Sequence, residues 1–294
     1  MIELIEDDGL VDVLKVVSST SGGVSAQTIL ANVEWPDGEI EETFVKFFSP
    51  ALRVKEIINE AFGHMCTNLV GLEQPLRVGI IKVNVEDIPD QVRNEFEGLE
   101  DNFASNHGYL YAWATKSIGS QSLKKIYFHT DDVSSAENFI NAMQAWDDLP
   151  KLITLDDWIG NSDRNAGNII FINSNRFAVI DHGRLFGVIN WLSEPLMPGN
   201  EFRNIAFEVF RIAHGGKPHA IACTPILHEA EVQREKFEGL RDNLKRVTLD
   251  LFKLLKMPAN SDVYTDSFIN YCQYRTATSK ARFTAKLSLH EVAV

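Results

Sequence analysis

The hydrophobic residues of this chain change their spacing along the sequence, and this change limits the fold more than any other feature. In the first third, apolar and β-branched residues form short runs between small residues, a pattern typical of strands. These runs lie at Leu10–Val17, Gln27–Trp35 and Thr43–Phe48. From residue 134 onward, most apolar residues recur every three or four positions, which is typical of amphipathic helices. We therefore predict a strand-rich N-terminal part followed by a mainly helical part.

The N-terminal part is expected to contain one helix among its strands. Short turns separate the first three runs, so a three-stranded antiparallel meander is the simplest arrangement. The spacing over Val54–Val70 predicts a helix that ends at Gly71. Two further strands are expected at Arg77–Val85 and Gly108–Thr115. We assign residues 1–116 to this N-terminal lobe.

Residues 117–294 are expected to form a helical lobe that carries one small hairpin. One helix is predicted at Leu149–Ile159, and the hairpin strands are predicted at Asn168–Ile172 and Phe177–Ile180. Three later helices are predicted at Phe202–Ala213, Glu229–Leu255 and Thr265–Tyr274. The predicted fold class is therefore α+β, with a strand-rich N-terminal lobe and a mainly helical C-terminal lobe.

The charge balance argues against polyanionic partners. Lys and Arg number 28 and Asp and Glu number 41, which gives a formal net charge of −13. We therefore expect no direct binding to nucleic acid or to an anionic membrane. The excess of acidic over basic residues is confined to residues 1–200, because residues 201–294 carry 14 basic and 11 acidic side chains. Four basic residues near the end are expected on a solvated face, with docking of an acidic partner as the alternative: Arg275, Lys280, Arg282 and Lys286.

Several features predict a cytoplasmic protein. The first ten residues carry four carboxylates and no basic residue, unlike a signal peptide. No apolar run approaches the roughly 18–20 residues that span a bilayer. Cys66, Cys223 and Cys272 are far apart, so we expect buried, reduced thiols and neither a disulfide framework nor a zinc site.

Residues whose side chains could take part in a reaction lie between Trp158 and Asp181. Asp163 and Asn168 have the Asp-x-x-x-x-Asn spacing of a kinase catalytic loop, and Asp181 begins an Asp-His-Gly where a kinase has Asp-Phe-Gly. Phosphoryl transfer needs a carboxylate for the attacking hydroxyl's proton, and oxygen ligands for Mg²⁺. We assign the first task to Asp163 and the second to Asn168 and Asp181, which the hairpin is expected to bring together. The alternative is a polar turn that favours Asp and Asn for its backbone geometry.

His182, beside Asp181, has two interpretations. It is expected to pack or to donate and accept hydrogen bonds, and the alternative is a metal ligand.

Lys46 lies inside an apolar strand, where an unpaired ammonium group would be costly. The predicted partner is Glu60 on the next helix, or less favourably Glu56. In kinases such a pair holds the lysine against the ATP phosphates. The alternative is a lysine whose head reaches solvent from the edge of the sheet.

Two further parts of a nucleotide site are expected from their order in the chain. The turn Ser18–Ser25 lies where a kinase has its phosphate-covering loop, and its glycines would permit close backbone approach to phosphate. The residues assigned there are Ser19, Ser21, Gly22 and Gly23. The backbone at Trp113 and Ala114 is expected to pair with adenine, unless these residues lie on an interior strand.

Together these motifs resemble those of the HipA-like Ser/Thr kinases, a family related in fold to protein and phosphoinositide kinases. The resemblance rests on the run Ile159–Arg164, on Asn168 and on Asp181-His182-Gly183, and it covers roughly Leu10 to Phe186. It implies a bilobal kinase fold, ATP with magnesium, and phosphorylation of Ser or Thr in a protein. Asp163 matches the family's catalytic base, Asn168 and Asp181 its metal ligands, and Lys46 its ATP lysine.

The resemblance also implies partners. Toxins of this family modify translation components such as aminoacyl-tRNA synthetases, and a DNA-binding antitoxin restrains them. Some members phosphorylate a serine of their own phosphate loop, for which Ser19 or Ser21 would be the counterpart. A small-molecule or lipid kinase, transfer of the whole nucleotide, and a nucleotide-binding pseudokinase that serves as an interaction module remain as alternatives.

Overall fold

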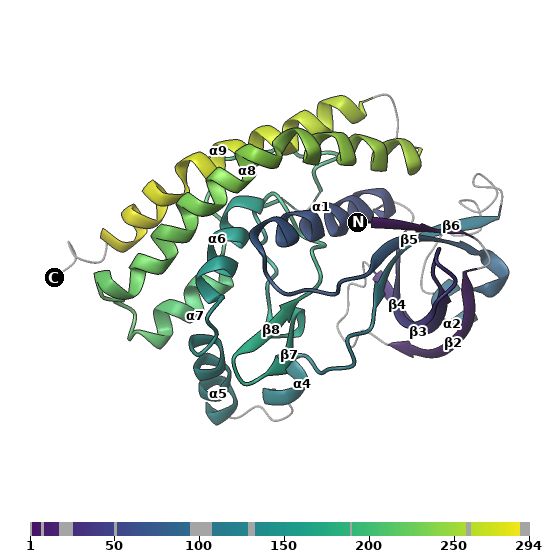
Figure 1. Cartoon of the computed structure of the whole chain (residues 1–294), viewed down its shortest axis with the longest axis horizontal. Coiled ribbons are helices and arrows are strands. Elements are labelled where there is room, and N and C mark those ends of the chain that lie inside the picture. The colour runs from purple at the N-terminus through teal and green to yellow at the C-terminus, as the bar shows by residue number, and fades with distance from the viewer. Residues whose placement is uncertain are drawn as a thin grey trace. The chain divides into compact units, whose positions relative to one another are not determined.

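The computed structural model describes residues 2–6, 9–17, 26–49, 52–94, 108–128, 133–188, 190–256 and 260–288. The chain divides into two compact units. The first unit comprises Met1–Ala61 and Pro75–Gly119, and the second comprises Phe62–Gln74 and Ser120–Val294. The first contains a sheet and the second is mainly helical (Figure 1). The mixed α/β composition, with the strands early and the helices late, agrees with the hydrophobic spacing.

The division between the units differs from the expected boundary after residue 116. It falls after Gly119, and Phe62–Gln74 belongs to the second unit. Helix α1 (Arg53–Val70) therefore contributes residues to both units, and it ends at Gly71, whose φ of 79° suits a residue without a side chain.

A six-stranded sheet forms the first unit. Its strands are β1 (Ile2–Ile5), β2 (Leu10–Val17), β3 (Ala26–Glu34), β4 (Ile40–Phe48), β5 (Val78–Asn84) and β6 (Tyr109–Lys116). Their order is β1-β5-β6-β4-β3-β2. The predicted antiparallel meander of β2, β3 and β4 is confirmed by their pairing. The sequence analysis missed β1, which pairs in parallel with β5, because four residues are too few to display a period.

Alternation along the strands directs Lys46 away from the main core of this unit. Val45 and Phe47 of β4 are fully buried, and they join Ile29 and Ala31 of β3 in one hydrophobic cluster. Since successive side chains of a strand point to opposite faces, Lys46 lies on the other face of the sheet.

Two short helices follow β5, η1 (Val85–Asp87) and α2 (Asp90–Arg93).

Helices surround a small hairpin in the second unit. The helices are α4 (Leu123–Tyr127), α5 (Val133–Gln144), α6 (Leu149–Ile159), η2 (Ala166–Asn168), α7 (Ile205–Ala213), α8 (Ala220–Leu254) and α9 (Ser261–Ser288). The hairpin strands β7 (Ile169–Asn173) and β8 (Arg176–Val179) are antiparallel, as predicted. Helices α8 and α9 lie side by side (Figure 1). Both are longer than predicted, because this packing extends them through polar sequence that shows little helical period.

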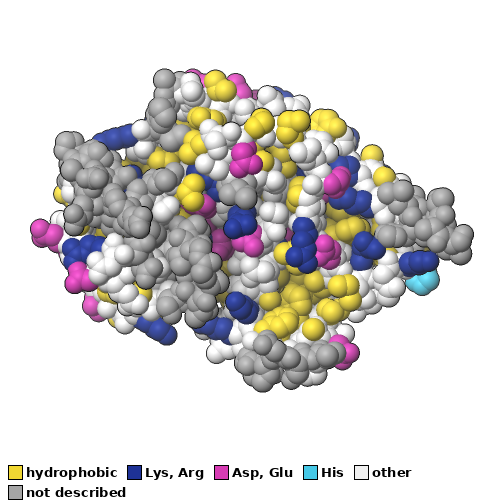
Figure 2. Space-filling model, turned by 180° about the vertical axis from the view of Figure 1, so that it is seen from behind, with side chains coloured by type: hydrophobic (Ala, Val, Ile, Leu, Met, Phe, Trp, Pro, Cys, Tyr) yellow, Lys and Arg dark blue, Asp and Glu magenta, His cyan; other side chains and the backbone are white. Residues whose placement is uncertain are grey.

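One face of the molecule is mixed in charge despite the net −13. On the face drawn in Figure 2, basic and acidic side chains are interspersed over the described residues. Among those residues, no helix is both long and apolar enough to cross a membrane. The three cysteines are buried and free, as expected, and burial raises their thiol pKa values.

Candidate functional site

The first unit brings Lys46 and Glu60 together. The Lys46 Nζ atom lies 2.8 Å from Oε1 of Glu60, and the side chains are 20% and 3% exposed, respectively. Lys46 also lies 5.3 Å from the centre of the Phe48 ring. Glu56, the less favoured partner, contacts Nζ of Lys55 instead, at 2.7 Å. The lysine is therefore ion-paired on the face of the sheet opposite the main core, and its side chain stays partly exposed.

Strand β6 is an interior strand at the residues expected to contact adenine. Trp113 lies opposite Lys46 of β4 and Ile80 of β5, and Ala114 is flanked by the same two strands. Because sheet partners on both sides use the backbone groups of such residues, Trp113 and Ala114 have no free edge for a base. This corrects the expected adenine contact, since the paired strand continues to Lys116.

The expected phosphate-loop residues, Ser19, Ser21, Gly22 and Gly23, lie outside the described residues.

In the second unit, residues 160–168 form a loop that asparagine side chains hold in shape; we call it the 160–168 loop. It begins at Gly160, with a φ of 69°, where an added Cβ would lie 2.4 Å from the Tyr271 hydroxyl. Asn161 Oδ1 accepts a hydrogen bond from the backbone N–H of Asp163 at 3.0 Å. Asn168 Nδ2 donates to the Asp163 carbonyl at 2.7 Å. These bonds fix the backbone of Asp163 from both sides.

Asp163 itself projects from this loop toward solvent. Its side chain is 54% exposed, and its nearest recorded cation is Arg184, whose Nε lies 3.9 Å from Oδ2. An exposed carboxylate on a fixed backbone has the access that a base for an incoming hydroxyl requires.

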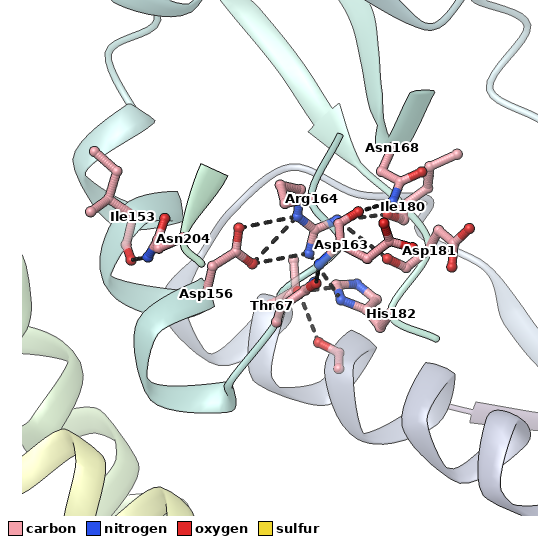
Figure 3. A network of polar contacts seen from close by, with 12 residues as sticks. Thr67, Ile153, Asp156, Asp163, Arg164, Asn168, Ile180, Asp181, His182 and Asn204 are labelled. Carbon is pink, nitrogen blue, oxygen red and sulfur yellow. Dashed lines mark hydrogen bonds and ion pairs between the residues drawn. The ribbon is translucent and has the colours of Figure 1, made fainter. Parts of the chain in front are cut away.

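The hairpin places Asn168 beside Asp181. The backbone N–H of Ile180 donates to the Asn168 carbonyl at 3.0 Å, so Asp181 follows directly after this contact (Figure 3). Asp181 has a φ of 62°, in the left-handed region that Asp tolerates better than most residues. Its Oδ1 accepts from the Gly183 N–H at 3.2 Å, which supports this turn.

The oxygen atoms of this pair suit Mg²⁺ bound to a phosphate. Asn168 uses Nδ2 as a donor, so its other polar atom is a carbonyl oxygen, the ligand type that magnesium takes. Asp181, which follows the residue that contacts Asn168, supplies a carboxylate. Within the described ranges, no group of three or more His, Cys, Asp or Glu residues could hold a metal alone. The residues present therefore fit an ion that also binds substrate phosphates and water, and they do not fit a closed protein site.

Arg164 is a central residue that the sequence analysis did not assign. Its side chain is fully buried, and its Nη2 lies 3.2 Å from Oδ1 of Asp156. The guanidinium also donates to the Ile180 carbonyl at 2.7 Å and the Asp181 carbonyl at 3.4 Å (Figure 3). Burial raises the pKa of Asp156 to about 6, although Arg164 beside it acts in the opposite direction. Asp156 lies within apolar sequence, which was a signal for a buried charge that needs a partner. Arg164 lies in a polar stretch and gave no such signal.

His182 is buried and hydrogen-bonded, which agrees with the expectation that it packs or forms hydrogen bonds. Its Nδ1 lies 3.2 Å from Arg164 Nη2, and its Nε2 lies 3.3 Å from Oγ1 of Thr67. Both ring nitrogens, the atoms through which histidine binds metals, therefore have protein partners.

The C-terminal basic residues do not form the expected solvated face. Arg275 is fully buried, and its Nη2 lies 3.1 Å from Oδ1 of Asp157. Arg282 contacts the other oxygen of this carboxylate, and Lys286 Nζ lies 3.6 Å from Oδ1. Of the four, Lys280 is the one with a half-exposed side chain. The prediction is wrong for Arg275 and Arg282, because the buried Asp157 needs cations nearby.

No protein-family model matches this chain, and no curated protein matches it.

Proposed function

We propose that this chain is a kinase that uses ATP and Mg²⁺ to phosphorylate Ser or Thr in a protein, with the bilobal fold of the protein kinases. The observation that carries the proposal is the contact of Asn168 with both Asp163 and Ile180. Through it, the two residues of an Asp-x-x-x-x-Asn motif lie next to the Asp of an Asp-x-Gly motif, which is the residue set of a kinase catalytic loop and metal site.

Each residue receives a role from its surroundings. Asp163, exposed on a fixed backbone, orients the substrate hydroxyl and accepts its proton. Asn168 and Asp181 hold Mg²⁺, which neutralises negative charge on the phosphates. Lys46, held by Glu60, binds the phosphates. Lys46 belongs to the first unit and Asp163 to the second.

The remaining parts of the nucleotide site are also proposed. Ser19, Ser21, Gly22 and Gly23 cover the phosphates, and adenine pairs with the backbone beyond Lys116, where β6 ends. Following the HipA-like resemblance, we propose a component of the translation machinery, such as an aminoacyl-tRNA synthetase, as substrate. An antitoxin protein is the proposed regulator, and the cytoplasm is the proposed location.

Labelled ATP tests this function. Purified full-length protein with Mg²⁺ and γ-labelled ATP is expected to label itself or a protein in a cell lysate. Asp163→Asn should reduce labelling by about 100-fold or more, because the hydroxyl loses its base. Asp250→Asn is the matched control, since Asp250 is an exposed carboxylate paired with Lys253 on α8. Thermal melting of both variants verifies that they fold.

The label also separates the alternatives. Label from α-labelled ATP in protein would indicate transfer of the nucleotide, and label in a small-molecule or lipid extract alone would indicate another acceptor. Undiminished labelling by Asp163→Asn would contradict the proposed role of Asp163. Stabilisation by Mg-ATP without transfer to any acceptor would favour a pseudokinase.

A further inference from the structure

A chain of buried hydrogen bonds joins the 160–168 loop to helix α1. Arg164 Nη2 lies 3.2 Å from His182 Nδ1, and His182 Nε2 lies 3.3 Å from Thr67 Oγ1. Thr67 Oγ1 lies 2.8 Å from the Gly63 carbonyl oxygen, one turn earlier in α1. Figure 3 shows this series of contacts beside Asp181.

The chemistry of the two end groups fixes the direction of every bond. Arginine donates hydrogen bonds and cannot accept them, so Nδ1 of His182 must accept from Arg164. The Gly63 carbonyl can accept only, so the Thr67 hydroxyl donates its hydrogen there. The Thr67 oxygen must then accept from Nε2 of His182. The imidazole is therefore neutral and carries its hydrogen on Nε2.

Helix α1 has a glycine where the imidazole approaches it. A Cβ built on Gly63 would lie 2.3 Å from both Cβ and Cγ of His182 and 2.7 Å from Nδ1. Such distances do not occur between real atoms, so any side chain at this position would displace the ring or the helix. The ring is 3% exposed. His182 is thus confined by the helix backbone as well as by two hydrogen bonds.

The same contacts confine the neighbouring carboxylate. Arg164 donates to the carbonyls of Ile180 and Asp181 and also reaches His182, so it contacts three successive residues. Asp181 has a positive φ, and a residue in this region keeps its conformation when its surroundings impose it. The anchored ring of the next residue supplies that restraint.

We propose that His182 is a positioning residue for the metal ligand Asp181, acting as the Nε2–H tautomer between Arg164 and Thr67. This inference rests on the proposed function, because it assigns a role around the metal site of that kinase. Residues that orient metal ligands typically contribute about 10-fold to 100-fold to metal affinity.

Removing the Thr67 hydroxyl tests the role without changing the side chain's shape. Thr67→Val is expected to weaken Mn²⁺ binding in the presence of ATP by about 10-fold, measured from the electron paramagnetic resonance signal of free Mn²⁺. The affinity for ATP without metal should stay within about two-fold. Thr248→Val is the matched control, because Thr248 is buried and donates to its own i−4 carbonyl at 2.7 Å. It should leave both affinities unchanged.

Nitrogen NMR of the histidine rings tests the tautomer independently of metal and activity. In the wild type, the spectrum should show His182 with hydrogen on Nε2 and a bare Nδ1, assigned by its absence from His182→Phe. Hydrogen on Nδ1 would overturn the inference, as would an unchanged Mn²⁺ affinity of Thr67→Val in a protein that transfers phosphate. If the wild type binds no Mn²⁺ with ATP, the proposed function fails together with the metal role, while the NMR result still decides the bond directions.

Discussion

Two neighbouring aspartates of α6 connect different regions of the second unit. Asp156 pairs with Arg164, eight residues later, in the 160–168 loop. Asp157 pairs with Arg275, 118 residues later, on α9. Successive helix residues point about 100° apart, so adjacent carboxylates face different neighbours. The first pair shapes the candidate site, and the second attaches a distant helix to the element that precedes this site.

The two networks also differ in their number of cations. Among the described residues, Asp156 has one recorded cation partner, whereas Asp157 has Arg275, Arg282 and Lys286. When a buried carboxylate with one cation partner loses that partner, nothing compensates its desolvation cost. We therefore expect the Asp156 network to be sensitive to single substitutions and the Asp157 network to be more tolerant.

The largest effect is expected at Arg164. Arg164→Met keeps much of the side-chain volume but leaves the Asp156 carboxylate buried without its cation. The free energy of unfolding should fall by about 3–5 kcal/mol, measured by urea denaturation with circular dichroism at pH 8. A loss no larger than that of Arg282→Met would contradict the difference between the two networks.

The pH dependence of Arg164→Met shows whether the buried charge is the cause. Burial already raises the pKa of Asp156 to about 6, and loss of Arg164 should raise it further. A pKa that is higher in the folded state gives stability that is present at low pH and lost as pH rises through that pKa. The destabilisation by Arg164→Met should therefore shrink by about 1–2 kcal/mol at pH 5 relative to pH 8. A constant difference would mean that lost packing explains the effect.

A smaller effect is expected where the Asp156 network reaches α1. Gly63→Ala should destabilise the protein by about 1–3 kcal/mol, because the new methyl group meets the His182 ring. Gly239→Ala is the matched control, a helical glycine of α8 with open space around it. It should stabilise the protein by about 0.5–1 kcal/mol through helix propensity. Equal effects of the two substitutions on the melting temperature would refute the crowding at His182.

The smallest effect is expected at the edge of the Asp157 network. Lys286→Met removes the ammonium group of a side chain that is 25% exposed. This group also contacts Glu201 at 2.7 Å. Because Arg275 and Arg282 remain at the carboxylate, the free energy of unfolding should change by no more than about 1 kcal/mol. A loss as large as that of Arg164→Met in the same urea titration would show that Asp157 depends on every cation.

The local sequence pattern was sufficient to predict much of the fold. The meander ending in Thr43–Phe48, the helix ending at Gly71 and the hairpin before Asp181 were predictable because period and turn residues act over a few positions. Strand β1 and the lengths of α8 and α9 were not, since pairing with β5 and helix–helix packing decided them.

The candidate site was predictable to a similar extent. The pairing of Lys46 with Glu60 followed from the cost of a buried charge, and the nearness of Asn168 and Asp181 followed from the hairpin. The interior position of Trp113 and Ala114 depended on strand order, which local sequence does not encode.

The sequence by itself therefore determined which residue types lie near one another in the chain: the Asp-x-x-x-x-Asn loop, the Asp-His-Gly and the lysine in an apolar strand. The tertiary structure decided which distant side chains become partners, joining Asp157 to Arg275 in an ion pair and His182 to Thr67 in a hydrogen bond. The physical reason is range. Periodicity and turn chemistry act between neighbours, whereas a buried charge takes whichever partner the packing of distant helices supplies.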